Sequence, residues 1–223
     1  MLNLPLHHLY RAAAADTPAP WLLVLMHGVG SNEQDLFGLA GMVPPAFHVL
    51  SLRAPYTLGP SSYAWFQFGV NPDGSRSIDT AQEKASRALV AQTCAEAAQA
   101  LQIPAQRVVV GGFSQGGIMS LSALLTQPQL LQAIMVWHSR LLPEIAAEQV
   151  APAQLAGRQA WISHGTADNV IPLAQAHAIR AALQATPVDL AYHEYPCRHE
   201  LHPQELQDSI AWLQALTQAQ QRG

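Results

Sequence analysis

The chain has 223 residues, of which 49% are hydrophobic and 12% charged, and its formal net charge is −4. This composition excludes a mainly disordered chain, because disorder requires low hydrophobicity and high charge. The 11 lysines and arginines are too few to give the basic character of a nucleic-acid-binding protein, so we expect no nucleic-acid partner. A chain of this length buries about 70% of the surface that its unfolded form exposes, which is enough for a stable hydrophobic core without disulfide bonds or structural metals.

Targeting signals and membrane spans are not visible in the sequence. The N-terminal residues lack a basic segment followed by an apolar one, which is the pattern of a secretory signal. The apolar runs are far shorter than the ~20 residues that cross a bilayer. Cys94 and Cys197 lack metal-ligand spacing and cannot form a disulfide framework, although a single bridge stays open. We therefore predict a cytoplasmic protein with no stable membrane insertion.

The predicted elements alternate between short apolar strands and helices. In chain order they are a weak strand over residues 4–10, strands over 21–26 and 47–52, a long ordered loop over 53–77, a helix over 78–102, a strand over 107–112, a helix over 118–126, strands over 133–137 and 159–163, a helix over 173–185, a strand over 188–195 and a helix over 203–219. Continuous apolar runs are typical of strands buried on both faces. The unbroken alternation predicts one α/β domain over residues 1–223, with a mainly parallel central sheet covered by helices on both faces.

A serine motif follows one of the predicted buried strands. Residues 112–117 read Gly-Phe-Ser-Gln-Gly-Gly, which matches G-x-S-x-G in the strand–turn–helix context of a nucleophile elbow. The glycines allow a tight turn that lifts the Ser114 hydroxyl above the sheet edge. The alternative is a glycine-rich turn whose serine only caps the helix, and the context disfavours it. We therefore predict that Ser114 is a nucleophile.

A serine hydroxyl needs a neighbouring base, and that base needs an acceptor that orients it. In an open α/β sheet, reacting groups gather beyond the carboxyl ends of the strands. This rule selects Asp168, although an Asx turn is the alternative role for its side chain. His199 follows the last predicted strand and completes the chain order Ser, Asp, His. His202 stays open as a rival base.

An oxyanion site is expected at the loop after the first buried strand. Residues 27–31 read His-Gly-Val-Gly-Ser, and in this architecture such a loop supplies one backbone N–H while the residue after the nucleophile supplies another. We assign these donors to Val29 and Gln115, and we expect His27 to brace the loop. The loop lacks the spacing of a phosphate-binding motif.

These motifs resemble those of the phospholipase/carboxylesterase family of serine hydrolases, which includes acyl-protein thioesterases and small bacterial carboxylesterases. The matching segments are residues 27–31, 53–55, 65–66, 112–117, 139–143 and 164–170, together with His199. The resemblance implies an α/β-hydrolase fold with a Ser114–Asp168–His199 triad. It also implies hydrolysis of carboxylic esters or thioesters with no cofactor and no metal.

The chain departs from the family pattern beside the expected site. A Cys-Arg pair ending in Arg198 stands where the family has a glycine before the histidine, and His138 occupies a position that is small in the family. We expect Arg198 to contact an acidic group of the substrate, with a solvent-facing arginine as the alternative. His138 is expected to line the pocket or to make a structural hydrogen bond. Trp65 and Phe66 are expected to form an apolar acyl wall, with ordinary packing as the alternative.

We therefore predict a serine carboxylesterase that forms an acyl-enzyme on Ser114 and acts on a small-molecule ester or thioester. The alternative enzyme is an acyl-protein thioesterase or lysophospholipase with the same triad. The alternative from another class is a non-catalytic binding module, because a fold does not by itself imply a function. A homodimer is a further expectation from the family and the apolar-rich composition.

Overall fold

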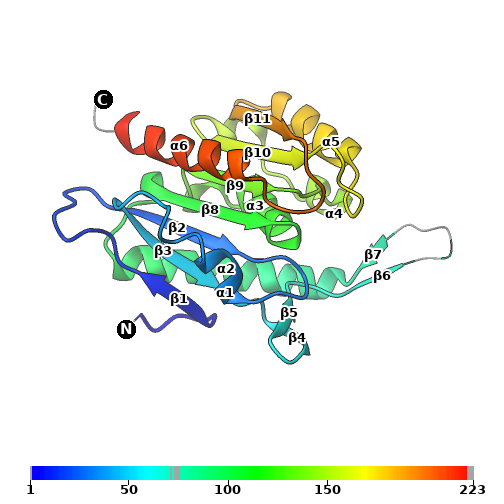
Figure 1. Cartoon of the computed structure of the whole chain (residues 1–223), viewed down its shortest axis with the longest axis horizontal. Coiled ribbons are helices and arrows are strands. Elements are labelled where there is room, and N and C mark those ends of the chain that lie inside the picture. The colour runs from blue at the N-terminus through cyan, green and yellow to red at the C-terminus, as the bar shows by residue number, and fades with distance from the viewer. Residues whose placement is uncertain (1, 71, 73–75, 220–223) are drawn as a thin grey trace.

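Seven strands form one central sheet, and most of them run parallel. The computed structural model describes residues 2–70, 72 and 76–219 (Figure 1). The strand order is β1-β3-β2-β8-β9-β10-β11, and only the β1–β3 pair is antiparallel. The strands are β1 (His8–Arg11), β2 (Trp21–Met26), β3 (Phe47–Leu52), β8 (Val108–Phe113), β9 (Ala133–Trp137), β10 (Gln159–Gly165) and β11 (Asp189–Tyr195).

Helices cover both faces of this sheet. They are α1 (Glu33–Phe37), α2 (Thr80–Ala100), α3 (Gln115–Thr126), α4 (Pro143–Ala147), α5 (Leu173–Gln184) and α6 (Pro203–Ala219), with 3-10 turns at Ala105–Arg107, Pro128–Leu130 and Pro152–Leu155. Side chains of α2, α3, α4 and α5 pack into one hydrophobic cluster, and those of α1 and α6 pack into another. No helix in the described ranges has the length and apolar character needed to cross a membrane.

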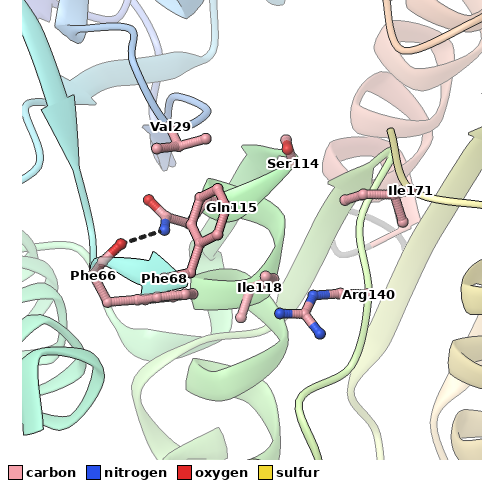
Figure 2. Close-up of a pocket in the computed structure, with 8 residues that line it drawn as sticks. All are labelled: Val29, Phe66, Phe68, Ser114, Gln115, Ile118, Arg140 and Ile171. Carbon is pink, nitrogen blue, oxygen red and sulfur yellow. Dashed lines mark hydrogen bonds between the residues drawn. The ribbon is translucent and has the colours of Figure 1, made fainter. Parts of the chain in front are cut away.

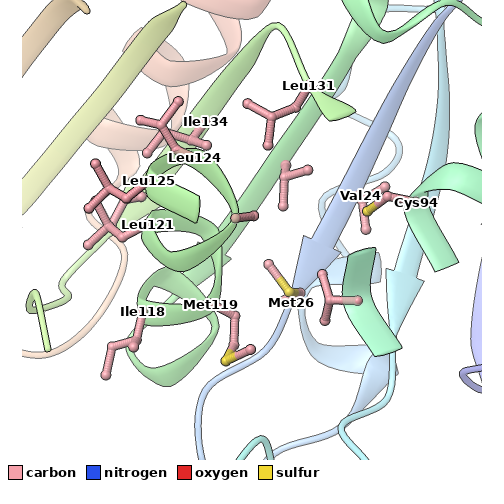
Figure 3. Packing of buried hydrophobic residues seen from close by; sticks show 14 of the residues in the cluster. Val24, Met26, Cys94, Ile118, Met119, Leu121, Leu124, Leu125, Leu131 and Ile134 are labelled. Atoms are coloured by element: carbon pink, nitrogen blue, oxygen red, sulfur yellow. The ribbon is translucent and has the colours of Figure 1, made fainter. Parts of the chain in front are cut away.

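Strand β2 shows why the sequence pattern specifies a two-sided core. All six of its residues are buried. Leu22, Val24 and Met26 face the cluster that contains α3, while Leu23 and Leu25 face the opposite cluster. Alternate side chains of a strand point to opposite faces, so a continuous apolar run is needed when both faces are covered. Figure 3 shows the α3 side of this packing.

The structure refines the predicted elements around this sheet. The predicted loop over residues 53–77 contains two small hairpins, β4 (Tyr56–Gly59) with β5 (Ser62–Ala64) and β6 (Phe68–Val70) with β7 (Arg76–Ile78). These strands are too short to show periodicity in the sequence. Helix α3 begins at Gln115 rather than at residue 118, because glycines in its first turn hide the helix start from propensity. Helices α1 and α4, of five residues each, were not expected.

Candidate active site

Ser114 occupies a strained turn between β8 and α3. Its backbone has φ 54° and ψ −115°, a region that L-residues rarely adopt and that costs about 1–3 kcal/mol. A Cβ on Gly112 would overlap the backbone of Gly116, and a Cβ on Gly116 would overlap the carbonyl oxygen of Met26. The glycines are therefore required by the close approach of backbone to backbone, and they let the turn present the serine at the sheet edge.

The three predicted triad residues meet at the carboxyl ends of their strands. Nε2 of His199 lies 3.0 Å from Oγ of Ser114, and Nδ1 of the same ring lies 2.7 Å from Oδ2 of Asp168. His199 comes from the loop between β11 and α6, and Asp168 from the loop between β10 and α5. These distances are hydrogen-bond distances, so the imidazole connects the hydroxyl to the carboxylate.

Asp168 is held by more than the imidazole. Its Oδ1 accepts hydrogen bonds from the backbone N–H groups of Val170, at 2.9 Å, and Ile171, at 2.8 Å. Burial by itself raises the pKa of Asp168, but the hydrogen bonds from His199 and from the two amides outweigh it, so the pKa lies below its usual value. The turn suggested as an alternative role thus coexists with the contact to His199, and it keeps the carboxylate ionised and aimed.

A second imidazole contacts the same carboxylate from behind. His138 is fully buried; its Nδ1 lies 3.2 Å from Oδ2 of Asp168 and its Nε2 lies 3.2 Å from Oε2 of Glu205 on α6. His138 adopts a positive φ of 49°, which is uncommon for a residue other than glycine. Glu205 was missed in the sequence because nothing marks a glutamate in a helix's first turn as buried.

The rival base does not reach the serine hydroxyl. The backbone N–H of His202 donates to Oε2 of Glu205 at 3.0 Å, and its ring lies beside that of Tyr195, with the centroids 6.0 Å apart. His202 therefore makes a hydrogen bond with the first turn of α6, whereas His199 faces Ser114.

Both expected oxyanion donors lie beside Ser114. Val29 and Gln115 line the same pocket as the serine. Gln115 is the first residue of α3, and first-turn N–H groups have no partner within their helix. Such a group is available to a developing negative charge, which the helix dipole also favours.

The Gln115 side chain has a second task that sequence reasoning did not assign. Its Oε1 accepts from the backbone N–H of Trp65 at 2.8 Å, and its Nε2 donates to the carbonyl oxygen of Phe66 at 2.7 Å (Figure 2). These two hydrogen bonds attach the segment that contains Trp65 and Phe66 to Gln115, the residue after the nucleophile. The glutamine in the motif thus couples the pocket wall to the helix.

His27 contacts backbone on both sides of its ring. Nε2 accepts from the N–H of Ala54 at 3.1 Å, so Nδ1 carries the hydrogen and donates to the carbonyl oxygen of Gly28 at 2.7 Å. Burial lowers the pKa of His27, which agrees with a neutral ring in this role. These contacts support the expected bracing of the loop that carries Val29.

A pocket with about 310 Å³ of empty space, including its open mouth, adjoins Ser114. Its lining consists of Val29, Phe66, Phe68, Ser114, Gln115, Ile118, Arg140 and Ile171 (Figure 2). Phe66 therefore lines this pocket, and its role as a wall for the acyl group stays a prediction.

Three other residues named as substrate contacts lie outside this pocket, in the roles given above as their alternatives. Trp65 is fully buried in the core, and its indole N–H donates to the carbonyl oxygen of His27 at 2.9 Å. His138 lies behind Asp168 with no exposed surface. Arg198 is exposed and is not among the described residues that line this pocket.

Among the described residues, two sets of side chains are close enough to be considered as metal ligands. They are His138 with Asp168 and His199, and His138 with Cys197 and Glu205. Hydrogen bonds already account for the first set. In the second, burial and the nearby carboxylates raise the pKa of the Cys197 thiol to about 11, which favours the neutral thiol over the thiolate that a metal requires.

The parallel sheet, the strained serine turn and the strand-end loops define an α/β-hydrolase. The phospholipase/carboxylesterase family profile matches residues 9–217. The chain belongs to this family, which confirms the predicted fold class and makes it a carboxylic ester hydrolase.

Relatives agree with this placement, and a solved structure agrees with the fold. The chain is 37% identical to acyl-protein thioesterase 1 of Gibberella zeae over 48% of this chain and 47% of that protein. It is 26% identical to acyl-protein thioesterase 1 of Mycosarcoma maydis over 89% of this chain and 92% of that protein. The crystal structure of the Bacillus cereus carboxylesterase superposes with a TM-score of 0.81 at 24% identity, covering 95% of this chain and 94% of that one.

Proposed function

We propose that the chain is a serine carboxylesterase that hydrolyses small carboxylic esters through an acyl-enzyme on Ser114. One observation carries the proposal. A single imidazole, that of His199, reaches Oγ of Ser114 at 3.0 Å with one nitrogen and the carboxylate of Asp168 at 2.7 Å with the other. This arrangement activates a serine hydroxyl at neutral pH, where it is otherwise a poor nucleophile.

Acylation follows from this geometry. Oγ of Ser114 attacks the ester carbonyl carbon while Nε2 of His199 takes the hydroxyl proton. The carbonyl oxygen becomes an oxyanion that accepts hydrogen bonds from the backbone N–H groups of Val29 and Gln115. The tetrahedral intermediate then breaks its bond to the alcohol oxygen, which takes the proton from Nε2 and leaves. Each oxyanion donor is worth about 10²–10³ in rate.

Deacylation uses the same groups in the reverse order. Water attacks the acyl carbon and gives a proton to Nε2 of His199, and collapse of the second intermediate releases the acid and returns the proton to Ser114. Asp168 stays ionised throughout and stabilises the imidazolium that forms in each half of the reaction. The hydrogen bonds from Val170 and Ile171 to Asp168 support this role.

A thioester with a long acyl group is the second candidate, and a surface feature favours the long acyl group. Beside the serine pocket lies a second hollow with about 610 Å³ of empty space, lined by Val29, Leu58, Ala64, Phe66, Gln67 and Phe68. The two hollows share Val29, Phe66 and Phe68, so a longer acyl chain could pass from one to the other. Two relatives are named acyl-protein thioesterase. The same triad would cleave an S-acyl bond.

The decisive variant is Ser114→Ala. We expect it to lower turnover of p-nitrophenyl butyrate by about 10⁴-fold or more and to abolish covalent labelling by a fluorophosphonate. The matched control is Ser120→Ala, which removes a buried hydroxyl in α3 that bonds to the carbonyl oxygen of Gly116. Wild-type protein that gains no adduct on Ser114 would instead be a binding module.

The acyl-chain preference separates the two substrate candidates. We expect p-nitrophenyl esters of short acids to have the highest kcat/KM if the serine pocket alone holds the acyl group. A preference for long acyl chains, together with faster cleavage of an S-palmitoyl peptide than of its O-acyl counterpart, would favour the thioesterase.

A further inference from the structure

Arg140 places a positive charge in the pocket of the nucleophile. It follows β9 by a short turn, and its guanidinium points into the region between Ile118 and Ile171 (Figure 2). The side chain is partly buried. Ser114 and Arg140 therefore lie on the lining of one small pocket.

The other residues that line the pocket strengthen the interaction of this charge with an anion. Five of the eight described residues that line the pocket are valine, phenylalanine or isoleucine, and Arg140 is the only charged one among those eight. A charge beside apolar walls interacts more strongly than one in open water, because the effective dielectric constant is lower. The chain as a whole carries a net charge of −4, so its general field does not attract anions, and among the described lining residues Arg140 is the group that would attract one.

We propose that Arg140 selects esters that carry a carboxylate, such as monoesters of dicarboxylic acids, and holds that carboxylate while Ser114 attacks the ester carbonyl. This inference rests on the proposed function and names its substrate class. A guanidinium presents planar N–H donors that match a carboxylate in two parallel hydrogen bonds. Arg140 has another interaction within the chain, but its five N–H donors can serve more than one acceptor.

The inference differs from the expectation that placed an acidic substrate group at Arg198. Arg198 is exposed and outside the pocket lining, whereas Arg140 shares the pocket with the reacting hydroxyl. The cation that binds the substrate carboxylate is thus Arg140, which follows β9, and not Arg198, which lies in the loop that carries His199.

The test compares two esters on each protein. One is the p-nitrophenyl monoester of glutarate; the other is the neutral ester in which two methyl groups replace the two carboxylate oxygens. The ratio of kcat/KM for the charged ester over the neutral one cancels differences in active enzyme. A second pair, acetoxybutyrate and a neutral acetate of equal size, carries the carboxylate on the alcohol side and reports which side Arg140 reads.

We expect the wild type to prefer the charged member of one pair, and Arg140→Gln to lower that ratio by about 10- to 100-fold, the range for a lost charge-assisted hydrogen bond. Arg140→Lys should keep part of the preference, since it keeps the charge but not the planar fork. Arg180→Gln, which removes an exposed arginine on α5, should leave the ratio unchanged.

The outcomes separate this inference from the proposed function. If the wild type cleaves the neutral esters and Arg140→Gln leaves both ratios unchanged, the assignment of Arg140 is wrong while the esterase stands. If Arg198→Gln lowers the ratio and Arg140→Gln does not, the carboxylate is read at Arg198. If no ester is cleaved and Ser114 takes no fluorophosphonate, the proposed function fails first.

Discussion

The two sides of Ser114 are built in different ways. On the acid–base side, His199, Asp168, His138 and Glu205 form one chain of hydrogen bonds, and the last three side chains have no exposed surface. On the substrate side the pocket wall is mostly apolar and partly open, and Phe68 is 39% exposed.

The difference reflects how precisely each side has to position its groups. A proton transfer needs donors and acceptors held within a few tenths of an ångström, and buried hydrogen bonds provide that precision because leaving a buried polar group unpaired costs about 1–3 kcal/mol. Binding an acyl group needs only apolar contact and one directing charge. The acid–base groups therefore follow the ends of sheet strands, with Glu205 added from the first turn of α6, while Phe68 comes from a hairpin outside the central sheet.

The largest effect is expected on the acid–base side. Asp168→Asn keeps the size of the side chain but removes the charge that stabilises the imidazolium and fixes its tautomer. We expect kcat for a p-nitrophenyl ester to fall by about 10⁴-fold, as in other triads, with little change in KM. The control is Asp189→Asn, at the exposed start of β11. A fall of less than tenfold would show that His199 does not depend on Asp168.

A smaller effect is expected behind the triad. His138→Ala removes the partner of two buried carboxylates and leaves a cavity, so we expect the free energy of unfolding to fall by about 2–5 kcal/mol in urea titration. The matched control is His177→Ala, which removes an exposed imidazole 2.8 Å from Glu194 and should cost less than about 1 kcal/mol. Equal losses for the two variants would contradict a structural role for the buried ring.

The smallest effect is expected on the substrate side. Phe68→Ala removes an aromatic wall but no reacting group, so we expect kcat/KM for esters with longer acyl chains to fall by about 10-fold, mainly through KM. Val70→Ala is the control, because Val70 lies on the same strand, is 67% exposed and does not line the pocket. A large fall in kcat for acetate esters would mean that the hairpin also positions the reacting groups.

Much of the acid–base side can be predicted from the sequence because each of its reacting residues follows a recognisable strand. A continuous apolar run fixes where a buried strand ends, and in a parallel sheet those ends meet at one edge. Ser114, Asp168 and His199 could therefore be selected one at a time without knowing their distances. The glycines around Ser114 add a local signal, since only glycine fits where backbone meets backbone.

The sequence by itself determined the order of the main strands along the chain and the turn that carries Ser114, and it selected Asp168 and His199 as partners with His202 still open as a rival base. Only the tertiary structure decided that Glu205 meets His138 across the sheet edge, that Trp65 belongs to the core, and that Arg140 rather than Arg198 lies in the pocket. Local patterns report periodicity and backbone constraints, whereas the direction of one side chain depends on what packs beside it from distant parts of the chain.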